Sequence, residues 1–467
     1  MQRRQLLLLG LSSLAVSACK TQSGYEVVFN EPPRQPAGTA TPVASPTAAV
    51  PPTAVPSPRP AAIMGATDSV LAQPTSVATV SRPALRVVKE RVLVRAGSSA
   101  APLTAIGVAT GAAAYTIPAD LATPDGLLWI GLHTTAGNTA VTLYAARDGS
   151  PVRAFWVPGR YSEGAVSHDS RRLLLVAPPL AADAKPVSEL ALVDLTSGAV
   201  LLYTTLAGRY RADTVDPANN GLYLIAAHPE RQHNAYEVTR YDAISKVVST
   251  VADKRSAQTI MSGYKVNQVW SKTGEWLYSL YLSPGADGAF IHALNVAARF
   301  AVCIDLPGGN ASEAQLQQYA LAITPAGDRV FAVNPALSVI NTFSVGDFGA
   351  SSSGLQLPSG AKVCGATLSR PINNCLVAPD GATLYAGTAQ GILVVPTAPA
   401  ALQPKSVWLA GQSIYSLGMG ASGALLYALV DGTPRRLLAL DARSGAVQAD
   451  LTGSIAQPVS IDQVVTV

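Results

Sequence analysis

The stretch "VAPDGATLYAG", Val377–Gly387, decides the fold. A Pro-Asp-Gly turn is followed at once by a short apolar run. The Asp-Gly pair allows the positive φ that tight hairpins need, and the run has the length of a strand. Six further copies of this arrangement begin at Ala122, Val166, Val215, Trp270, Ile323 and Gly420. Successive turns lie roughly 42 to 54 residues apart, which indicates a repeat architecture.

Two further elements complete each repeat. The first is a strand, an Asp-led turn and another strand, as in "LALVDLTSGAVLLYTTL" from Leu190 and "LLALDARSGAVQADL" from Leu437. The second is an apolar residue, a small residue and a glycine, as in Val157–Gly159 and Leu206–Gly208. Four short strands in a unit of about 50 residues match one blade of a β-propeller.

The combined pattern is specific enough to resemble known repeats. The order PDG-x-x-LY, then D-x-x-[ST]-G, then [LV]-x-G resembles the YVTN/WD40-like propeller repeats of bacterial surface proteins. "ALDARSGAV", from Ala439, also resembles the repeats of PQQ-type propellers. The resemblance covers about 380 residues and implies an all-β propeller fold. It does not imply one activity, because propellers carry many functions.

The ends of the repeat region predict the number of blades. Seven full units run from about Ala119 to Leu451. Before them stand three strand-like pieces, "RVLVRA", "PLTAIGV" and "AAAYTIP", and after them stands "PVSIDQVVTV". Paired together, these pieces would make one composite four-stranded blade that closes the ring and removes exposed sheet edges. We therefore expect eight blades, or seven if the extra pieces only thicken existing blades.

The N-terminus predicts export. Arg3 and Arg4 precede the apolar run Leu6–Val16, which is too short to span a bilayer. We expect residues 1–18 to be a signal peptide. "VSAC", ending at Cys19, resembles the bacterial lipobox, which implies that Cys19 is lipidated. Two acyl chains would anchor the protein stably in a membrane. An ordinary signal peptide with a chance cysteine is the alternative, and the arginine pair leaves Sec and twin-arginine export open.

A proline-rich segment follows the predicted anchor. Ten residues between Glu31 and Pro60 are proline, so residues 19–84 are predicted to be a disordered, extended linker. The propeller would then occupy residues 85–467. The predicted location is outside the cell membrane, or on the periplasmic face of an envelope membrane. The net charge of +4 is too small to indicate a nucleic-acid partner, and the sequence has no Lys/Arg-rich run.

No catalytic motif stands out in the sequence. GxSxG, P-loop, HExxH and CxxC patterns are absent, and we expect no metal and no cofactor. Recurring aspartates such as Asp125, Asp169 and Asp380 are interpreted as turn formers. Cys364 and Cys375, eleven residues apart, could form a disulfide or remain two thiols. Cys303 lies in an apolar run and is expected to be a buried thiol.

The connections between units provide a candidate binding face. "GRYSEG" from Gly159 and "GRYRAD" from Gly208 occupy equivalent positions. Arginine and tyrosine side chains on adjacent blades would form a cationic, aromatic patch of the kind favoured in binding hot spots. The alternative is that these are ordinary solvated loop residues. The candidate residues are Arg160, Tyr161, Arg209, Tyr210, Arg211, Tyr264 and Lys265.

The sequence therefore favours an exported, lipid-anchored propeller that binds a protein or a small ligand at one face. The alternatives are a propeller enzyme, similar to a lactonase or a quinone-dependent dehydrogenase, and a structural envelope component. An enzyme would need His, Glu, Asp or Arg side chains converging at the mouth of the channel.

Overall fold

The computed structural model describes residues 89–98, 101–135, 137–177, 179, 185–231, 234–253, 259–285, 288–347, 351–354, 374–398, 402–455 and 457–467. Residues 1–18, Cys19, Cys364 and the predicted linker 19–84 lie outside these ranges. The signal peptide, the lipidation site and the linker therefore stay predictions.

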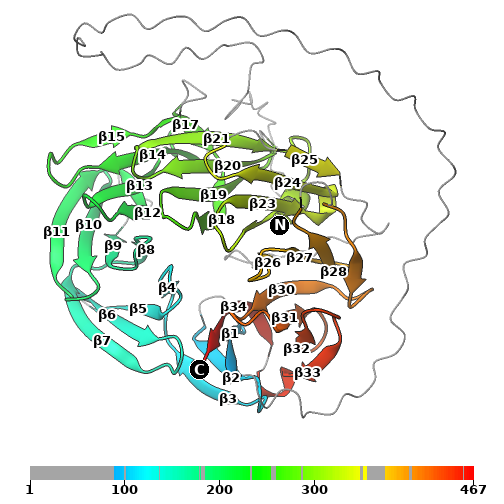
Figure 1. Ribbon diagram of the computed structural model, residues 1–467. Helices are drawn as coiled ribbons and strands as arrows, with labels where there is room; N and C mark the ends of the chain where they lie inside the picture. Colours follow the sequence, from blue (N-terminus) through cyan, green and yellow to red (C-terminus); the bar gives the residue numbers. More distant parts are fainter. Residues whose placement is uncertain are drawn as a thin grey trace, which may run out of the picture. The chain divides into compact units, whose positions relative to one another are not determined.

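The described residues form eight sheets, one for each blade, and all their strand pairs are antiparallel except that of one short added strand. The expectation of an all-β, eight-bladed propeller with four-stranded blades is therefore confirmed (Figure 1). In order from the first strand of each blade outward, blade 1 contains β34 (Pro458–Thr466), β1 (Glu90–Ala96), β2 (Leu103–Gly107) and β3 (Ala113–Ile117). Blade 2 contains β4 (Leu121–Ala122), β5 (Leu128–Thr134), β6 (Asn138–Ala145) and β7 (Pro151–Pro158). Blade 3 contains β8 (Glu163–Val166), β9 (Arg172–Ala177), β10 (Val187–Asp194) and β11 (Val200–Ala207).

The next two blades each carry an extra short strand. Blade 4 contains β12 (Arg209–Asp216), β13 (Gly221–Ala227), β14 (Ala235–Tyr241) and β15 (Val248–Thr250), and β17 (Ile260–Ser262) also pairs with β14. Blade 5 contains β18 (Tyr264–Trp270), β19 (Trp276–Ser283), β20 (Gly288–Asn295) and β21 (Phe300–Leu306), with β16 (Ala252–Asp253) parallel to β21.

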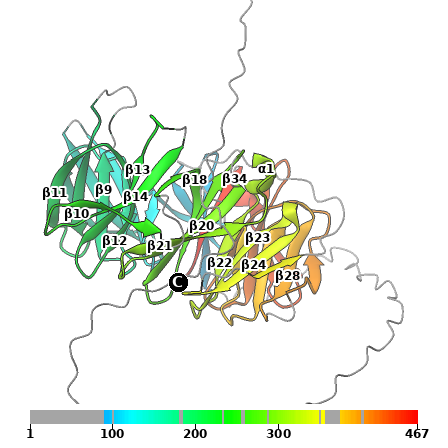
Figure 2. The same cartoon turned by 90° about the horizontal axis from the view of Figure 1, so that it is seen from above.

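The last three blades return to the simple pattern. Blade 6 contains β22 (Ala320–Ile323), β23 (Arg329–Asn334), β24 (Val339–Ser344) and β25 (Ser351–Gly354). Blade 7 contains β26 (Cys375–Val377), β27 (Thr383–Thr388), β28 (Gly391–Pro396) and β29 (Ser406–Trp408). Blade 8 contains β30 (Ile414–Met419), β31 (Leu425–Val430), β32 (Arg436–Asp441) and β33 (Val447–Asp450). The short helix α1 (Glu313–Leu316) lies between blades 5 and 6 and is labelled in Figure 2.

Blade 1 is the composite blade that the sequence predicts. Strand β34, from the end of the chain, pairs antiparallel with β1. Figure 1 shows the red strand β34 beside the blue strands β1 and β2. The two ends of the repeat region therefore close the ring by forming one sheet.

The core is divided among the seams between blades. Eight clusters of buried apolar side chains are present among the described residues, and each combines side chains from two neighbouring blades. Most central strands of the blades are thus covered on both faces, which explains why their apolar and polar residues alternate imperfectly. Within the described part of the chain, no helix is both long enough and apolar enough to span a bilayer.

The recurring aspartates act as turn formers, as predicted. The Oδ1 atom of Asp125 accepts a hydrogen bond from the Leu127 backbone N–H at 3.0 Å. In the other turn type, Asp194 Oδ1 accepts from the Ser197 N–H at 2.7 Å, and these bonds lower the pKa of Asp194. The carboxylates therefore organise the backbone of the hairpins.

Candidate functional site

The first Gly-Arg-Tyr connection, between blades 2 and 3, is held by a hydroxyl group. Thr139 Oγ1 donates to the carbonyl of Gly159 and accepts from the backbone N–H of Tyr161, both at 2.9 Å. The Tyr161 side chain is only 1% exposed and packs in the core between these blades. The structure therefore corrects its expected place on an exposed face: Tyr161 is a packing residue, whereas Arg160 is exposed.

The second connection, between blades 3 and 4, repeats this geometry. Ser188 Oγ donates to the Gly208 carbonyl at 3.0 Å and accepts from the Tyr210 N–H at 2.9 Å. Tyr210 is half-buried and packs against the core between blades 3 and 4. Because side chains alternate along a strand, Arg209 and Arg211 lie on the opposite face of β12, towards blade 5. The two Gly-Arg-Tyr connections, which the sequence predicts to be equivalent, therefore also share the same pattern of hydrogen bonds.

Three of the predicted binding residues meet at one cavity. A pocket of about 190 Å³, here called the seam pocket, lies between blades 4 and 5. Its lining includes Arg211 from β12 and both Tyr264 and Lys265 from β18. The other lining residues are Ala212, Ile225, Ala227, Asn234, Ala235, Tyr236, Gly263 and Tyr281. Whether these residues bind a ligand stays a prediction.

A buried ion pair lies beside the seam pocket. Lys265 Nζ lies 2.7 Å from Oδ1 of Asp213, whose side chain is 2% exposed, and it also donates to Gln268 Oε1 at 3.0 Å. Asp213 occupies an irregularity in the pairing of β12 with β13. This aspartate fixes the position of the ammonium group while leaving the Lys265 side chain 25% exposed. The blade 4 carboxylate thus orients a blade 5 cation.

Aromatic rings line part of the seam pocket. The rings of Tyr236 and Tyr281 stack with centroids 4.7 Å apart, across the seam between the two blades. The Tyr264 hydroxyl donates to Glu313 Oε1 at 2.9 Å. The Tyr281 side chain is 2% exposed, and burial raises the pKa of its hydroxyl well above the usual value.

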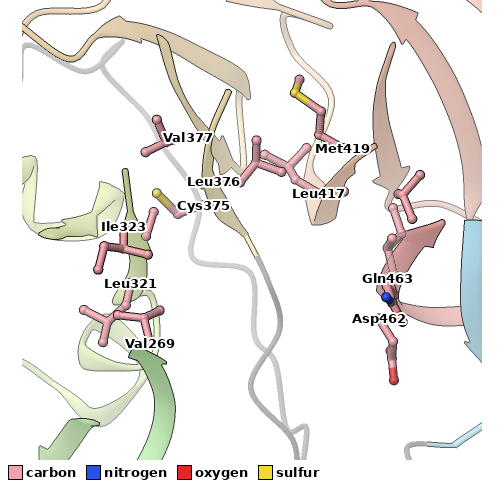
Figure 3. A pocket seen from close by; sticks show the side chains of 14 residues that line it. Val269, Leu321, Ile323, Cys375, Leu376, Val377, Leu417, Met419, Asp462 and Gln463 are labelled. Carbon is pink, nitrogen blue, oxygen red and sulfur yellow. The ribbon is translucent and has the colours of Figure 1, made fainter. Parts of the chain in front are cut away.

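A second cavity occupies the centre of the ring. This channel pocket, about 350 Å³ in volume, is lined by the first strands of blades 5 to 8 and of blade 1. Figure 3 shows the aliphatic side chains of Leu321 and Ile323 across the opening from Asp462 and Gln463. Most of its other lining side chains are also apolar, among them Val269, Leu376, Val377, Leu417, Met419, Ile461 and Val464.

The two polar side chains of the channel pocket make internal hydrogen bonds. Asp462 Oδ2 accepts from Arg95 Nε at 2.6 Å. Gln463 Oε1 accepts from Trp129 Nε1 at 2.7 Å, and its amide group donates to the Gly126 carbonyl. The Gln463 contacts tie blade 1 to blade 2, whereas the Asp462 contact joins two strands of blade 1. The other side chains that line the channel are mainly aliphatic.

Cys375 is the one described cysteine or histidine that lines either cavity, and His292 packs edge-on against Tyr281, which lines the seam pocket. Cys375 lines the channel pocket, is 5% exposed, and has its pKa raised by burial. The disulfide with Cys364 stays a prediction. Cys303 is buried, as expected. No group of three or more His, Cys, Asp or Glu side chains that could hold a metal gathers within the described ranges.

Sequence reasoning missed the residues that complete the seam pocket. Asp213 lies 52 residues before its partner Lys265, so no local pattern joins them. The sequence did contain one signal. Asp213 is an acidic residue in the first strand of a blade, at a position where a buried side chain is usually apolar. Tyr281 lies in an apolar run and Tyr236 in a strand of mixed polarity, and neither gave a signal of its own.

Comparisons with known proteins support the fold. No protein family and no curated protein matches the sequence. Among solved structures, the chain is similar to dihydro-heme d1 dehydrogenase NirN, with a TM-score of 0.50, 14% identity, and coverage of 81% of this chain and 75% of that one. The periplasmic gluconolactonase PpgL of Pseudomonas aeruginosa gives a TM-score of 0.39 at 16% identity, covering 72% of this chain and 99% of that one. At such identities the likeness to NirN shows a shared propeller fold and nothing finer.

Proposed function

We propose that this protein is a membrane-anchored, extracytoplasmic binding module, with its ligand or partner engaged at the seam between blades 4 and 5. The observation that carries the proposal is the convergence of Arg211, Tyr264 and Lys265 on one cavity. The sequence singled out these residues for their type and position, without knowledge of a pocket. Anchoring through Cys19 and the linker 19–84 would hold this face clear of the membrane.

The enzyme alternative is less well supported by the site. Arg211 and Lys265 are cationic, and the acidic Asp213 is already bound to Lys265. NirN is named as a dehydrogenase, but an identity of 14% carries only the fold. The seam pocket supplies charge and aromatic surface, which suit recognition.

A cross-linked pull-down from native envelopes tests the proposal. The bait is the full-length protein, compared with an Arg209→Ala/Arg211→Ala variant. The matched control is Arg147→Ala/Arg443→Ala, which removes two exposed arginines from turns of blades 2 and 8. We expect a partner that the wild type and the control capture and that the seam variant loses. Equal capture by all three proteins would remove the seam as the binding face.

A further inference from the structure

Three side chains with soft or borderline metal-binding atoms meet in the core between blades 4 and 5. Cys303 Sγ donates to Met261 Sδ at 3.6 Å and lies 3.9 Å from His292 Nδ1. All three residues are buried, with exposed fractions of 5% or less. A thiol, a thioether and an imidazole are thus gathered around one sulfur atom, away from water.

Three strands bring these side chains together. Cys303 on β21 lies directly opposite His292 on β20 in the blade 5 sheet. Met261 comes from β17, the short strand that is added to blade 4 and pairs with three residues of β14. No local motif predicts the group, because Cys303 is 42 residues from Met261 and 11 residues from His292. The added strand therefore supplies the third donor of the set.

The spacing of the donor atoms suits one bound ion. A sulfur ligand lies about 2.3 Å from its metal, and an imidazole nitrogen lies about 2.0–2.1 Å away. At ligand–metal–ligand angles of about 110–120°, two sulfur ligands are then about 3.8–4.0 Å apart, and a sulfur and a nitrogen are about 3.6–3.8 Å apart. The two contacts of Cys303, at 3.6 and 3.9 Å, lie close to these values. The Cys303 sulfur therefore needs little movement to share an ion with either neighbour.

The donor types favour monovalent copper. Thiolate and thioether sulfur atoms select Cu(I), and imidazole also binds copper. When Cu(I) binds, it replaces the thiol proton of Cys303, which leaves to solvent, so the core gains no net charge. A structural zinc site takes four ligands from Cys, His and carboxylate side chains, and no third side chain of these types joins the set within the described residues.

The surroundings keep the donors in a form that can bind a metal. Burial lowers the pKa of His292, so its imidazole is neutral near pH 7. Its other nitrogen, Nε2, makes no hydrogen bond within the described residues, so no partner dictates which nitrogen carries the proton. The Tyr281 ring packs edge-on against His292, and the Tyr236 hydroxyl donates to Met261 Sδ at 3.7 Å. Aromatic rings thus flank two of the three donors.

We propose that Met261, His292 and Cys303 form a Cu(I) site inside the propeller, between blades 4 and 5. Its ligands are the Met261 thioether, the His292 Nδ1 atom and the Cys303 thiolate. The ion reaches them where β17 separates from β14, because a strand held by three residue pairs opens more readily than the long strands of the blades. This site is separate from the proposed binding face, so copper binding and partner capture can be lost independently.

The test is an anaerobic titration of the reduced, metal-free, full-length protein with Cu(I), in competition with the chelator bathocuproine disulfonate. We expect the wild type to hold one equivalent of Cu(I) that Cys303→Ser loses. His292→Gln and Met261→Leu should each weaken the binding of that equivalent at least tenfold. The matched controls remove the same residue types elsewhere: Cys375→Ser and Met419→Leu in the channel pocket and the exposed His133→Gln. All three controls should bind Cu(I) as the wild type does.

Two further measurements separate loss of the metal from loss of folding. Copper X-ray absorption should show two sulfur ligands and one nitrogen ligand in the wild type, and one sulfur fewer in Met261→Leu. This substitution nearly conserves core volume, so the urea midpoint of the metal-free variant should stay close to that of the wild type. Cu(I) should raise the midpoint of the wild type and of Met419→Leu but not that of Cys303→Ser.

The remaining outcomes count against the site. Failure of the wild type to hold Cu(I), or equal retention by the wild type and Cys303→Ser, would overturn the proposal. Zn²⁺ bound as tightly as Cu(I), or an absorption spectrum that is the same for Met261→Leu and the wild type, would overturn it too. Capture of an envelope partner that depends on Arg209 and Arg211, without any copper binding, would leave the proposed function standing and remove the copper site alone.

Discussion

Arg95 is the residue whose loss should most directly weaken closure of the ring. It lies on β1, is 1% exposed, and donates from Nε to Asp462 on β34 at 2.6 Å. Its other nitrogens donate to the carbonyls of Ala101 and Ala119, at 2.6 and 3.0 Å. The guanidinium also lies 5.7 Å from the ring of Trp129 in blade 2. One buried cation thus joins both ends of the repeat region to the next blade.

We expect Arg95→Met to lower the free energy of unfolding by about 3 kcal/mol. Breaking a buried ion pair from one side costs about 3–5 kcal/mol, and the low end applies because the Asp462 side chain is 15% exposed. Urea unfolding followed by tryptophan fluorescence measures the change. Adding Asp462→Asn completes a double-mutant cycle, and the coupling between the two side chains should exceed about 1 kcal/mol.

Hydrogen exchange supplies the decisive comparison for Arg95. If the residue secures the closure, the amides of β34 and β1 should exchange faster in Arg95→Met than those of blades 4 to 6. A stability loss below about 1 kcal/mol, with exchange in β34 unchanged, would refute the reasoning. If stability falls by the expected amount but amide exchange becomes faster by the same factor in all blades, Arg95 has a general packing role and does not specifically secure the closure.

Three further predictions concern other parts of the chain. Cys19→Ala should abolish labelling by a fatty-acid analogue and move the protein out of the membrane fraction; retained label would contradict the lipobox assignment. Gly208→Ala should destabilise the fold by about 1–3 kcal/mol in urea, because Gly208 has φ of 128° and a Cβ there would meet the Tyr210 ring at 2.9 Å. Burial lowers the pKa of His292 in the folded, metal-free protein. As the pH falls through about 6.5, this histidine therefore takes up a proton in the unfolded chain before it does so in the folded protein. Stability should therefore fall from pH 7 to pH 5, with a smaller slope in His292→Gln; equal slopes would exclude His292 as a source.

The repeat architecture could be predicted because its signals are local. Each Pro-Asp-Gly or Asp-x-x-Ser-Gly turn sets its own hairpin through hydrogen bonds within a few residues, as Asp125 and Asp194 show. Even the composite blade followed from counting strands, since the three strands at the front lacked a first strand and the strand at the end lacked the other three. The sequence left open whether the ring has seven or eight blades. The pairing of β34 with β1 shows that it has eight.

The site was only partly predictable because burial depends on neighbours that are distant in the sequence. Tyr161 and Tyr210 share one motif, yet one is in the core and the other half-buried, depending on how the adjacent blade packs. Lys265 was identified as a basic residue, whereas its pairing with Asp213 depends on the seam between two blades. The channel pocket likewise arises only when five first strands are brought together.

The composite blade also has a consequence for how the protein folds. Arg95 and Asp462 are 367 residues apart, and loop-closure entropy grows by about 0.6 kcal/mol for each doubling of length. Joining β34 to β1 therefore costs roughly 3 kcal/mol more than closing a 15-residue loop. Such a contact forms slowly, so seven blades can assemble as an open arc before the last strand arrives. Until β34 arrives, both β34 and the edge of β1 lack a strand partner. The time spent in this state sets the period during which proteolysis and aggregation compete with folding.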